Sequence, residues 1–196
     1  MSSDFIDTIK RAIAGRYHLR GGERKWILEE GEPPTEIHVP NKAAAIAFSL
    51  DRPDPKPFAF FSCSPPRDFA KMCDAILFCF HENKTYLFLT EVKTGNEGDC
   101  DKQLVNGKLF CDWLIALCSQ HKSLNPHVIV VPLLVWKPRH NSVHKGTTTH
   151  RGNSDGTEDG IEKKSFGEFD GCGFEIRNKP TVQIFKLIKY LEHTMI

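Results

Sequence analysis

Three charged residues on two apolar segments have the types and spacing needed for phosphoryl chemistry. Glu91 and Lys93 lie near the end of the segment TYLFLTEVKT, and Asp74 opens the segment DAILFCF. Side chains at positions i and i+2 of a strand point to the same face, so Glu91 and Lys93 are expected to project together. If the two segments pair as a hairpin, the start of the first lies beside the end of the second. Asp74 is then expected next to Glu91.

Two carboxylates at one edge of a sheet are costly to desolvate unless a cation offsets their charge. Mg²⁺ takes carboxylate and carbonyl oxygens and keeps several waters, and Mn²⁺ is the alternative. We therefore expect Asp74, Glu91 and the main-chain carbonyl of Val92 to hold the metal. Lys93 would position the attacking water, whose pKa the metal lowers. The simpler interpretation is a surface ion pair between Glu91 and Lys93, worth at most ~1 kcal/mol.

Four predicted elements surround these residues and indicate an α/β chain. They run strand, strand, helix, strand, at 74–80, 85–94, 101–120 and 127–136, with a polar turn at 81–84. The strands are apolar runs, and the helix carries apolar residues at helical spacing. Pro132 in the last strand implies a bulge or an edge. With a short strand expected at 58–63, the order favours a mixed central β-sheet flanked by helices.

The other segments are expected to complete a single domain, 1–196, around a core of about 58–136. They are an N-terminal helix and extension (1–57), a polar mobile loop (140–164) and a C-terminal strand and helix (173–196). Neither the polar loop nor the extension contains an internal repeat. We therefore expect one compact unit rather than several.

Within these outer segments, helices are expected at both ends of the chain. An amphipathic helix capped by Ser2-Ser3-Asp4 is expected to run up to Gly21-Gly22. Residues 26–39 are expected as strands and turns. The remaining predictions are a short buried helix at 42–50, a turn at 52–57, a strand at 173–177 and a helix at 180–194 with Pro180 near its first turn.

The composition is that of an ordinary soluble globular protein. Hydrophobic residues make up 40% of the chain, which is enough for a core without metal or disulfide staples. The seven cysteines form no CxxC pair, so the strong zinc signatures are absent. No apolar run approaches the ~20 residues of a membrane span. Because no signal peptide is recognisable, we expect a cytoplasmic protein without membrane contact.

Two basic segments are candidates for binding phosphates, although the formal net charge is only +1. Local clusters of Lys and Arg bind phosphates even on a neutral protein. The candidate nucleic-acid contacts are Lys10, Arg11, Arg16, Arg20, Arg139, His140, Lys145 and Arg151. Binding through them would weaken with salt. An ordinary solvated surface is the alternative for each segment.

From Phe58 to Trp136 the chain resembles the PD-(D/E)xK nuclease superfamily, which has a restriction-endonuclease-like core. In that family the first acid opens the second core strand and Glu-x-Lys lies in the third. The resemblance thus implies catalytic roles for Asp74, Glu91 and Lys93. Many members also carry a Gln on the helix that follows, near the active site, and Gln103 is found at that position. An exposed polar residue on the first turn of the helix is the alternative for Gln103.

The chain departs from the family pattern at several positions. Cys73 precedes Asp74 where the motif has Pro, and the literal Pro53-Asp54 lies in a predicted turn. The Gln-x-x-x-Tyr form of one branch is not matched, because Gly107 follows Gln103 at that spacing. Some relatives carry a further acid on an early helix. The sequence does not distinguish between the candidates for it, Glu29, Glu30 and Glu36.

The resemblance implies a metal-dependent nuclease that hydrolyses phosphodiester bonds. A DNA endonuclease is expected in preference to an enzyme acting on RNA, with restriction, phage defence or repair as its setting. A homodimer or a partner protein in a larger complex is also expected. The alternative is a non-catalytic nucleic-acid-binding or interaction subunit that keeps the nuclease-like fold.

Other candidate sites in the sequence are weaker. The spacing of a possible zinc site matches no recognised pattern; its ligands would be His140, His144, His150 and Cys172. Asp99 and Asp101 are interpreted as caps of the following helix, with a second metal site as a remote option. No GxxxxGK loop is found, so ATP dependence has no support.

Overall fold

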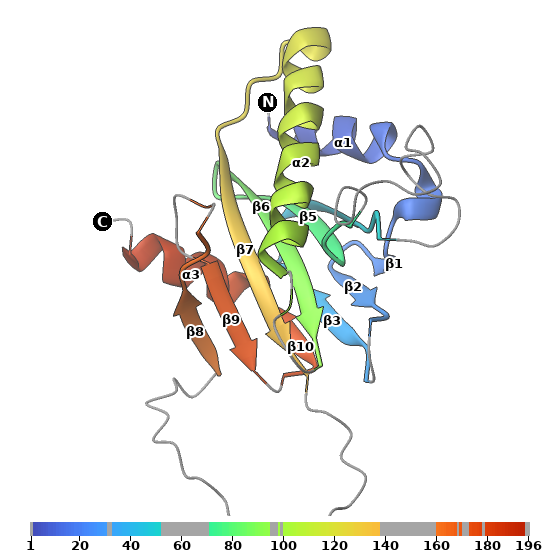
Figure 1. Ribbon diagram of the computed structural model, residues 1–196. Coiled ribbons are helices and arrows are strands. Elements are labelled where there is room, and N and C mark those ends of the chain that lie inside the picture. Colours follow the sequence, from blue (N-terminus) through green and yellow to red (C-terminus); the bar gives the residue numbers. More distant parts are fainter. Residues whose placement is uncertain are drawn as a thin grey trace, which may run out of the picture.

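The computed structural model describes residues 2–30, 33–51, 71–94, 98, 100–137, 160–167, 169, 173–177 and 179–194. In this part of the chain, three α-helices accompany two mixed β-sheets (Figure 1). The expected α/β class is therefore confirmed, whereas the second sheet was not predicted. None of the described helices has both the length and the apolar composition of a membrane span.

The helices are α1 (Ser2–Ala12), α2 (Cys100–Lys122) and α3 (Ile184–Thr194), with a 3-10 turn η1 at Gly15–Tyr17. The larger sheet contains, in spatial order, β4 (Ala44–Phe48), β5 (Ala75–His81), β6 (Lys84–Lys93), β7 (Val128–Trp136), β9 (Gly173–Arg177) and β8 (Ile161–Lys164). The smaller sheet contains β1 (Arg20–Gly22), β2 (Lys25–Leu28), β3 (Thr35–His38) and β10 (Thr181–Gln183).

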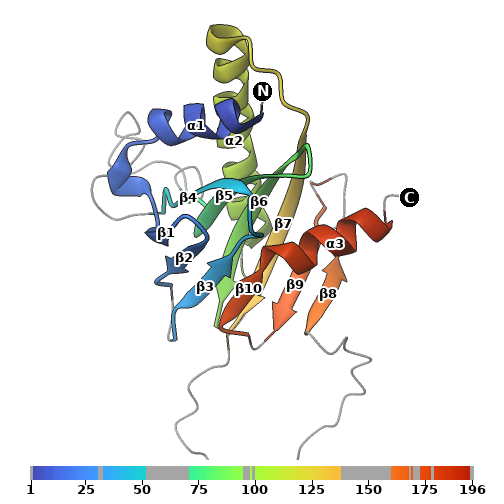
Figure 2. The same cartoon turned by 180° about the vertical axis from the view of Figure 1, so that it is seen from behind.

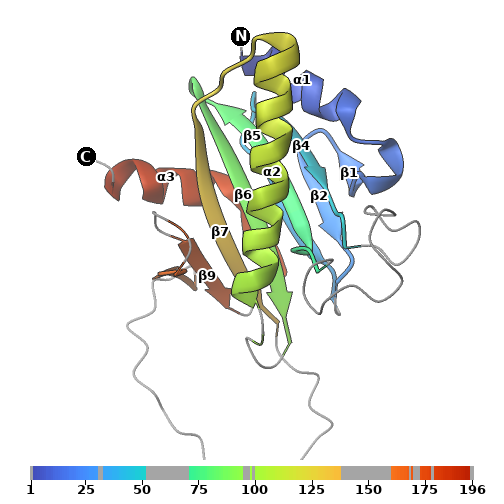
Figure 3. The same ribbon diagram turned by 45° about the horizontal axis from the view of Figure 1, so that its top comes forward.

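The six-stranded sheet forms the middle of three layers. α1 and α2 pack on one face, and α2 runs along β6 and β7 (Figure 3). The four-stranded sheet and α3 cover the other face, as the reverse view shows (Figure 2). Because both faces are covered, β5 and β6 are buried almost throughout. This explains why their sequences are continuous apolar runs rather than alternating patterns.

β5 and β6 form the hairpin that the sequence predicted. Their antiparallel register runs from Ala75 opposite Thr90 to His81 opposite Lys84. The connecting residues Glu82 and Asn83 both have positive φ, 47° and 63°. Positive φ at both central residues is the mark of a type I′ turn, whose twist matches that of the strands. The hairpin thereby fixes which residues of the two strands meet.

β7 returns parallel to β6 after the long helix α2. This crossover is the connection that parallel strands require. The pairing of β6 with β7 continues through Pro132, opposite Leu89, so there is no bulge. Pairing of β7 with β9 begins only at Leu133. β7 lies between β6 and β9, so Pro132 is not on an edge strand of the sheet; it directly precedes the stretch of β7 that pairs with β9.

Two predictions for the N-terminal part are wrong. Residues 44–48 were expected within a buried helix but form the edge strand β4, which pairs with β5. In this strand Ile46 packs into the core on one face of the larger sheet and Ala47 into the core on the other face. The first helix ends at Ala12, well before Gly21-Gly22. Those glycines belong to β1, where Gly21 has a φ of 141° and packs against the backbone of Lys25.

Two predictions for the C-terminal part also need correction. Residues 161–164, expected in a mobile loop, form β8 on the edge of the larger sheet. The last helix begins at Ile184 and not near Pro180, because Thr181–Gln183 pair with β3 as β10. The turn expected at 52–57, the strand expected at 58–63 and most of the expected loop lie outside the described residues.

Candidate active site

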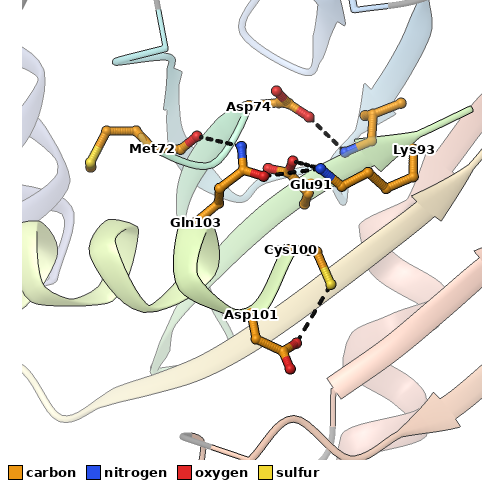
Figure 4. A network of polar contacts seen from close by, with 8 residues as sticks. Met72, Asp74, Glu91, Lys93, Cys100, Asp101 and Gln103 are labelled. Carbon is orange, nitrogen blue, oxygen red and sulfur yellow. Dashed lines mark hydrogen bonds and ion pairs between the residues drawn. The ribbon is translucent and has the colours of Figure 1, made fainter. Parts of the chain in front are cut away.

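Asp74 and Glu91 lie side by side at the open end of the β5–β6 hairpin (Figure 4). β5 begins directly after Asp74, and its first pair joins Ala75 to Thr90. Asp74 Oδ2 accepts a hydrogen bond of 2.6 Å from the amide of Val92. The structure therefore brings together the two acids and the backbone position that the sequence singled out as metal ligands.

Both carboxylates are buried, with 6% of Asp74 and 1% of Glu91 exposed. Desolvation raises the pKa of Asp74 to about 8, the charge of Glu91 adds to this, and the Val92 N–H opposes it. Desolvation also raises the pKa of Glu91, against the opposing effects of Lys93 and of the backbone N–H of Asp74. Glu91 Oε2 is buried and has no hydrogen-bond partner among the described residues. An unpartnered carboxylate oxygen beside a second buried acid is a donor set that fits Mg²⁺ or Mn²⁺.

Lys93 and Gln103 form a chain of polar contacts next to the acids. Lys93 Nζ donates to Glu91 Oε1 at 2.6 Å and to Gln103 Oε1 at 2.9 Å. Gln103 Nε2 in turn donates to the main-chain oxygen of Met72 at 3.3 Å (Figure 4). Gln103 therefore joins α2 both to the lysine and to the backbone two residues before Asp74. It is not the exposed polar residue that was the alternative.

α2 can approach the hairpin this closely because of Gly107. A Cβ atom at this position would lie 2.6 Å from Cys73 Sγ and 3.4 Å from a methyl group of Leu89. Residues four apart on a helix share a face, so the contact at Gly107 also brings Gln103 against the hairpin. Asn106 adds a further tie, since its Nδ2 donates to the main-chain oxygen of Lys71 at 2.7 Å.

Sequence reasoning missed Lys137, which directly follows β7. Its amide donates to the main-chain oxygen of Lys93 at 2.9 Å. Its buried Nζ donates to the main-chain oxygens of Glu30 and Pro33, which lie between β2 and β3. Burial lowers the pKa of Lys137, and the charges of Glu30 and Asp74 oppose this shift. Lys137 thus ties the smaller sheet to the end of β6 that carries the site.

Two further acids act on the site. Charges on Glu30 and Asp51 both raise the pKa of Asp74. Asp51 lies three residues after β4, and the β4–β5 register carries that part of the chain toward Asp74. The pKa of Asp51 is itself raised, by burial and then by Glu30. Asp51 was not singled out from the sequence. Both Asp51 and Lys137 are charged residues that closely follow an apolar strand, and this pattern would have identified them.

The structure separates the three early acids that the sequence left equivalent. Glu29 forms an ion pair of 2.9 Å with Arg20. Glu36 pairs with Lys25 and with His38, which lower its pKa. Glu30 is thus the one of the three whose charge acts on Asp74.

The predicted basic contacts are not gathered at the acid pair by any contact in the described regions. Arg11 binds the main-chain oxygen of Asp7, Arg16 lies 5.1 Å from the ring centroid of Tyr17, and Arg20 pairs with Glu29. Lys10 is exposed on α1. The other predicted basic contacts lie outside the described residues: Arg139, His140, Lys145 and Arg151. The same is true of four of the weaker candidates: Asp99, His144, His150 and Cys172.

The described residues include no group of three or more His, Cys, Asp or Glu side chains that could hold a metal ion. The candidate site has two such side chains, and the charge of Glu91 acts on Asp74. Its predicted third ligand is a main-chain oxygen. Asp101 does not extend it, since this acid contacts the thiol of Cys100. No protein-family model matches this chain, and neither does any curated protein or solved structure.

Proposed function

We propose that this chain is a metal-dependent nuclease that hydrolyses phosphodiester bonds at Asp74, Glu91 and Lys93. The observation that carries the proposal is the buried, unpartnered oxygen of Glu91 beside Asp74, whose pKa is raised to about 8. Holding two carboxylates together in a poorly solvated place destabilises a fold. Such strain is typical of active sites, where function opposes stability.

The order of elements supports membership of the PD-(D/E)xK superfamily within this proposal. Apart from η1 and β1–β3, which lie between α1 and β4, the order is a helix, a three-stranded antiparallel meander, a second helix and a parallel strand, namely α1, β4–β5–β6, α2 and β7. Asp74 directly precedes the second strand of this set, and Glu91 and Lys93 end the third. The first core strand is then β4, in place of the segment at 58–63.

Each residue of the site has a role that its contacts suggest. Asp74, Glu91 and the carbonyl of Val92 would hold Mg²⁺ or Mn²⁺, which polarises a phosphate and lowers the pKa of a bound water. Lys93 Nζ orients the attacking water and offsets charge on the phosphate oxygens. Gln103 fixes the position of Lys93 through its 2.9 Å contact. Of the possible substrates we favour DNA, cut internally by a homodimer or with a partner protein, in restriction, phage defence or repair.

The experiment that tests the proposal is cleavage of supercoiled plasmid, single-stranded DNA and RNA with Mg²⁺, Mn²⁺ or EDTA. We expect metal-dependent cutting that falls at least a hundredfold in Lys93→Ala and in Glu91→Gln. Lys84→Ala is the matched control, because Lys84 lies on the same strand and pairs with Glu192 at 3.3 Å, at the other end of β6. It should leave cutting unchanged.

Calorimetric titration of Mn²⁺ without substrate provides an independent reading of the same site. Wild type and Lys84→Ala should bind Mn²⁺, and Glu91→Gln should not. Cutting that persists in EDTA, or that survives both substitutions, would refute the proposal. Metal-independent binding of nucleic acid without any cutting would favour a non-catalytic subunit with this fold.

A further inference from the structure

A row of side chains crosses the larger sheet from the candidate site, on the face that α2 covers. The parallel pairings place Lys93 beside Trp136 and Trp136 beside Arg177. Paired residues of neighbouring strands point to the same face and lie about 5 Å apart. An amine, an indole and a guanidinium therefore succeed one another outward from Glu91. The row ends at Arg177 on β9.

Trp136 and Arg177 form a platform with aromatic and cationic character. The Arg177 guanidinium lies 5.6 Å from the centroid of the Trp136 ring, and its side chain is 55% exposed. The indole Nε1 is buried and has no hydrogen-bond partner in the described part of the chain. Indole N–H groups usually find a partner when buried. A partly buried indole with an exposed cation over it is an arrangement that stacks on a planar ligand.

The charges around the platform favour an anionic ligand. The buried acid next to the platform, Glu175, lies in the same row as Glu91 and pairs with Arg177 and, at 3.4 Å, with Lys164. Two cations thus surround one carboxylate next to the platform, and Lys93, which pairs with Glu91, lies at the inner end of the row. Glu162, opposite Glu175 on β8, is exposed and places an acid at the outer limit. Arg177 is therefore the exposed cation of the row that can meet a phosphate beside the platform.

We infer that this row binds an unpaired nucleotide next to the phosphate that is cut, with its base stacked on the Trp136–Arg177 platform. This inference rests on the proposed function and makes single-stranded nucleic acid, or an unpaired loop or end, the preferred substrate. A base inside a duplex already has both faces stacked on its neighbours and cannot use the platform. An unpaired base can, whatever its identity, because every base has a planar face.

The test compares binding of one labelled single strand with binding of the duplex of the same sequence, by fluorescence anisotropy in EDTA so that no metal-dependent cutting occurs. Trp136→Leu should weaken binding of the single strand about tenfold and binding of the duplex less than about twofold. Arg177→Gln should weaken both and reduce the slope of affinity against salt by about one.

A matched control is found on the opposite side of the molecule. Lys189 Nζ lies 4.1 Å from the ring centroid of Phe185 on α3, which packs on the other face of the sheet. Phe185→Leu and Lys189→Gln remove the same kinds of group and should leave binding of both strands unchanged. Trp136→Phe keeps an aromatic ring and should therefore retain most of the wild-type affinity for the single strand. Unfolding midpoints of all variants show whether a loss of binding reflects a loss of fold.

The outcomes separate this inference from the proposed function. If Trp136→Leu affects single-strand binding no more than Phe185→Leu does, or if wild type binds no single strand, the inference is wrong. That result leaves any cutting dependent on Lys93 untouched. If the binding depends on Trp136 while wild type cuts nothing with any metal, the row is a nucleic-acid surface and the proposed function fails.

Discussion

At the scale of single residues, the unfavourable energy of the site is concentrated on Asp74. Its pKa rises from 3.8 to about 8, first because it is buried and then because Glu91 is close. The folded protein therefore binds this proton more tightly than the unfolded chain does. Because of that difference, Asp74 lowers stability progressively as the pH rises from about 4 to about 8. Below this range the group is protonated in both states and contributes no such loss.

Asp74→Asn should therefore stabilise the protein at pH 8 by on the order of 5 kcal/mol and leave stability at pH 4 almost unchanged. The amide oxygen of Asn can still accept the hydrogen bond from Val92. Urea unfolding at the two pH values measures the difference. Asp112→Asn, at an exposed acid paired with Lys108, is the control and should change stability little at either pH. Equal stabilisation by Asp74→Asn at both pH values would contradict the assigned pKa.

A bound divalent cation should remove the same unfavourable energy. At pH 8, Mg²⁺ at a hundred times its dissociation constant should stabilise wild type by about 2.7 kcal/mol. The melting temperature of Asp74→Asn should not respond to Mg²⁺, since a proposed metal ligand is lost. Removal of Mg²⁺ with EDTA should reverse the shift in wild type. An equal shift in the two proteins would indicate that Mg²⁺ binds elsewhere.

At the scale of elements, the site depends on how closely α2 approaches the β5–β6 hairpin. Gln103 reaches Lys93 and Met72 only because Gly107, one turn later, rests against Cys73 without a side chain. Cys73 is the residue before Asp74, so the helix and the acid are fixed by one contact. A change in this contact should affect the fold and the site together.

Gly107→Ala should destabilise the protein by about 1–3 kcal/mol, although alanine is the better helix former, because its Cβ would overlap Cys73 Sγ. Chemical denaturation measures the loss. Cys73→Ala removes that sulfur, so the double variant should be more stable than the sum of the single effects predicts. Additive effects would show that the helix is not held by this contact.

Lys137 is expected to hold the turn between β2 and β3 in place. Lys137→Met keeps the length of the side chain and loses the hydrogen bonds to Glu30 and Pro33, so we expect a loss of about 2–3 kcal/mol. Hydrogen exchange should accelerate most in β2 and β3. Lys84→Met, at a half-exposed lysine of β6, should leave this exchange unchanged. Unaltered exchange in Lys137→Met would exclude the assigned role.

The sequence predicted the hairpin, α2 and β7 because each is a long apolar pattern with clear limits, and so it also placed Asp74 beside Glu91. It did not predict β4, since an alanine-rich segment has no strand preference apart from its pairing with β5. β8 and β10 are short and form only on distant partners. Lys137 and Glu30 come together through the packing of two sheets, which no local pattern encodes.

At the scale of the whole molecule, the two sheets share one hydrophobic core. Trp26 and Ile37 of the smaller sheet pack in the same cluster as Leu77 and Phe88 of the larger sheet and Leu187 of α3. Layers that share their buried surface cannot unfold separately without exposing it. The contact of Lys137 with the turn after β2 adds a polar link between the same two sheets.

We therefore expect a single cooperative unfolding transition. With Trp113→Phe and Trp136→Phe introduced together, Trp26 is the one remaining tryptophan and reports on the smaller sheet alone. Its fluorescence and the far-ultraviolet circular dichroism should give the same midpoint in urea. An earlier transition in fluorescence would show that the smaller sheet opens first.

The pairing of β3 with β10 joins strands that are synthesised far apart in time. β3 leaves the ribosome early, but its neighbour β10 and the helix α3 that completes the core belong to the last described part of the chain. Until β10 and α3 are synthesised, the β2–β3 hairpin therefore has an unpaired strand edge on β3 and an exposed apolar face. A nascent chain of this protein is thus a natural client for chaperones, and a stop codon before β10 would release an aggregation-prone fragment rather than a weakened form of the folded protein.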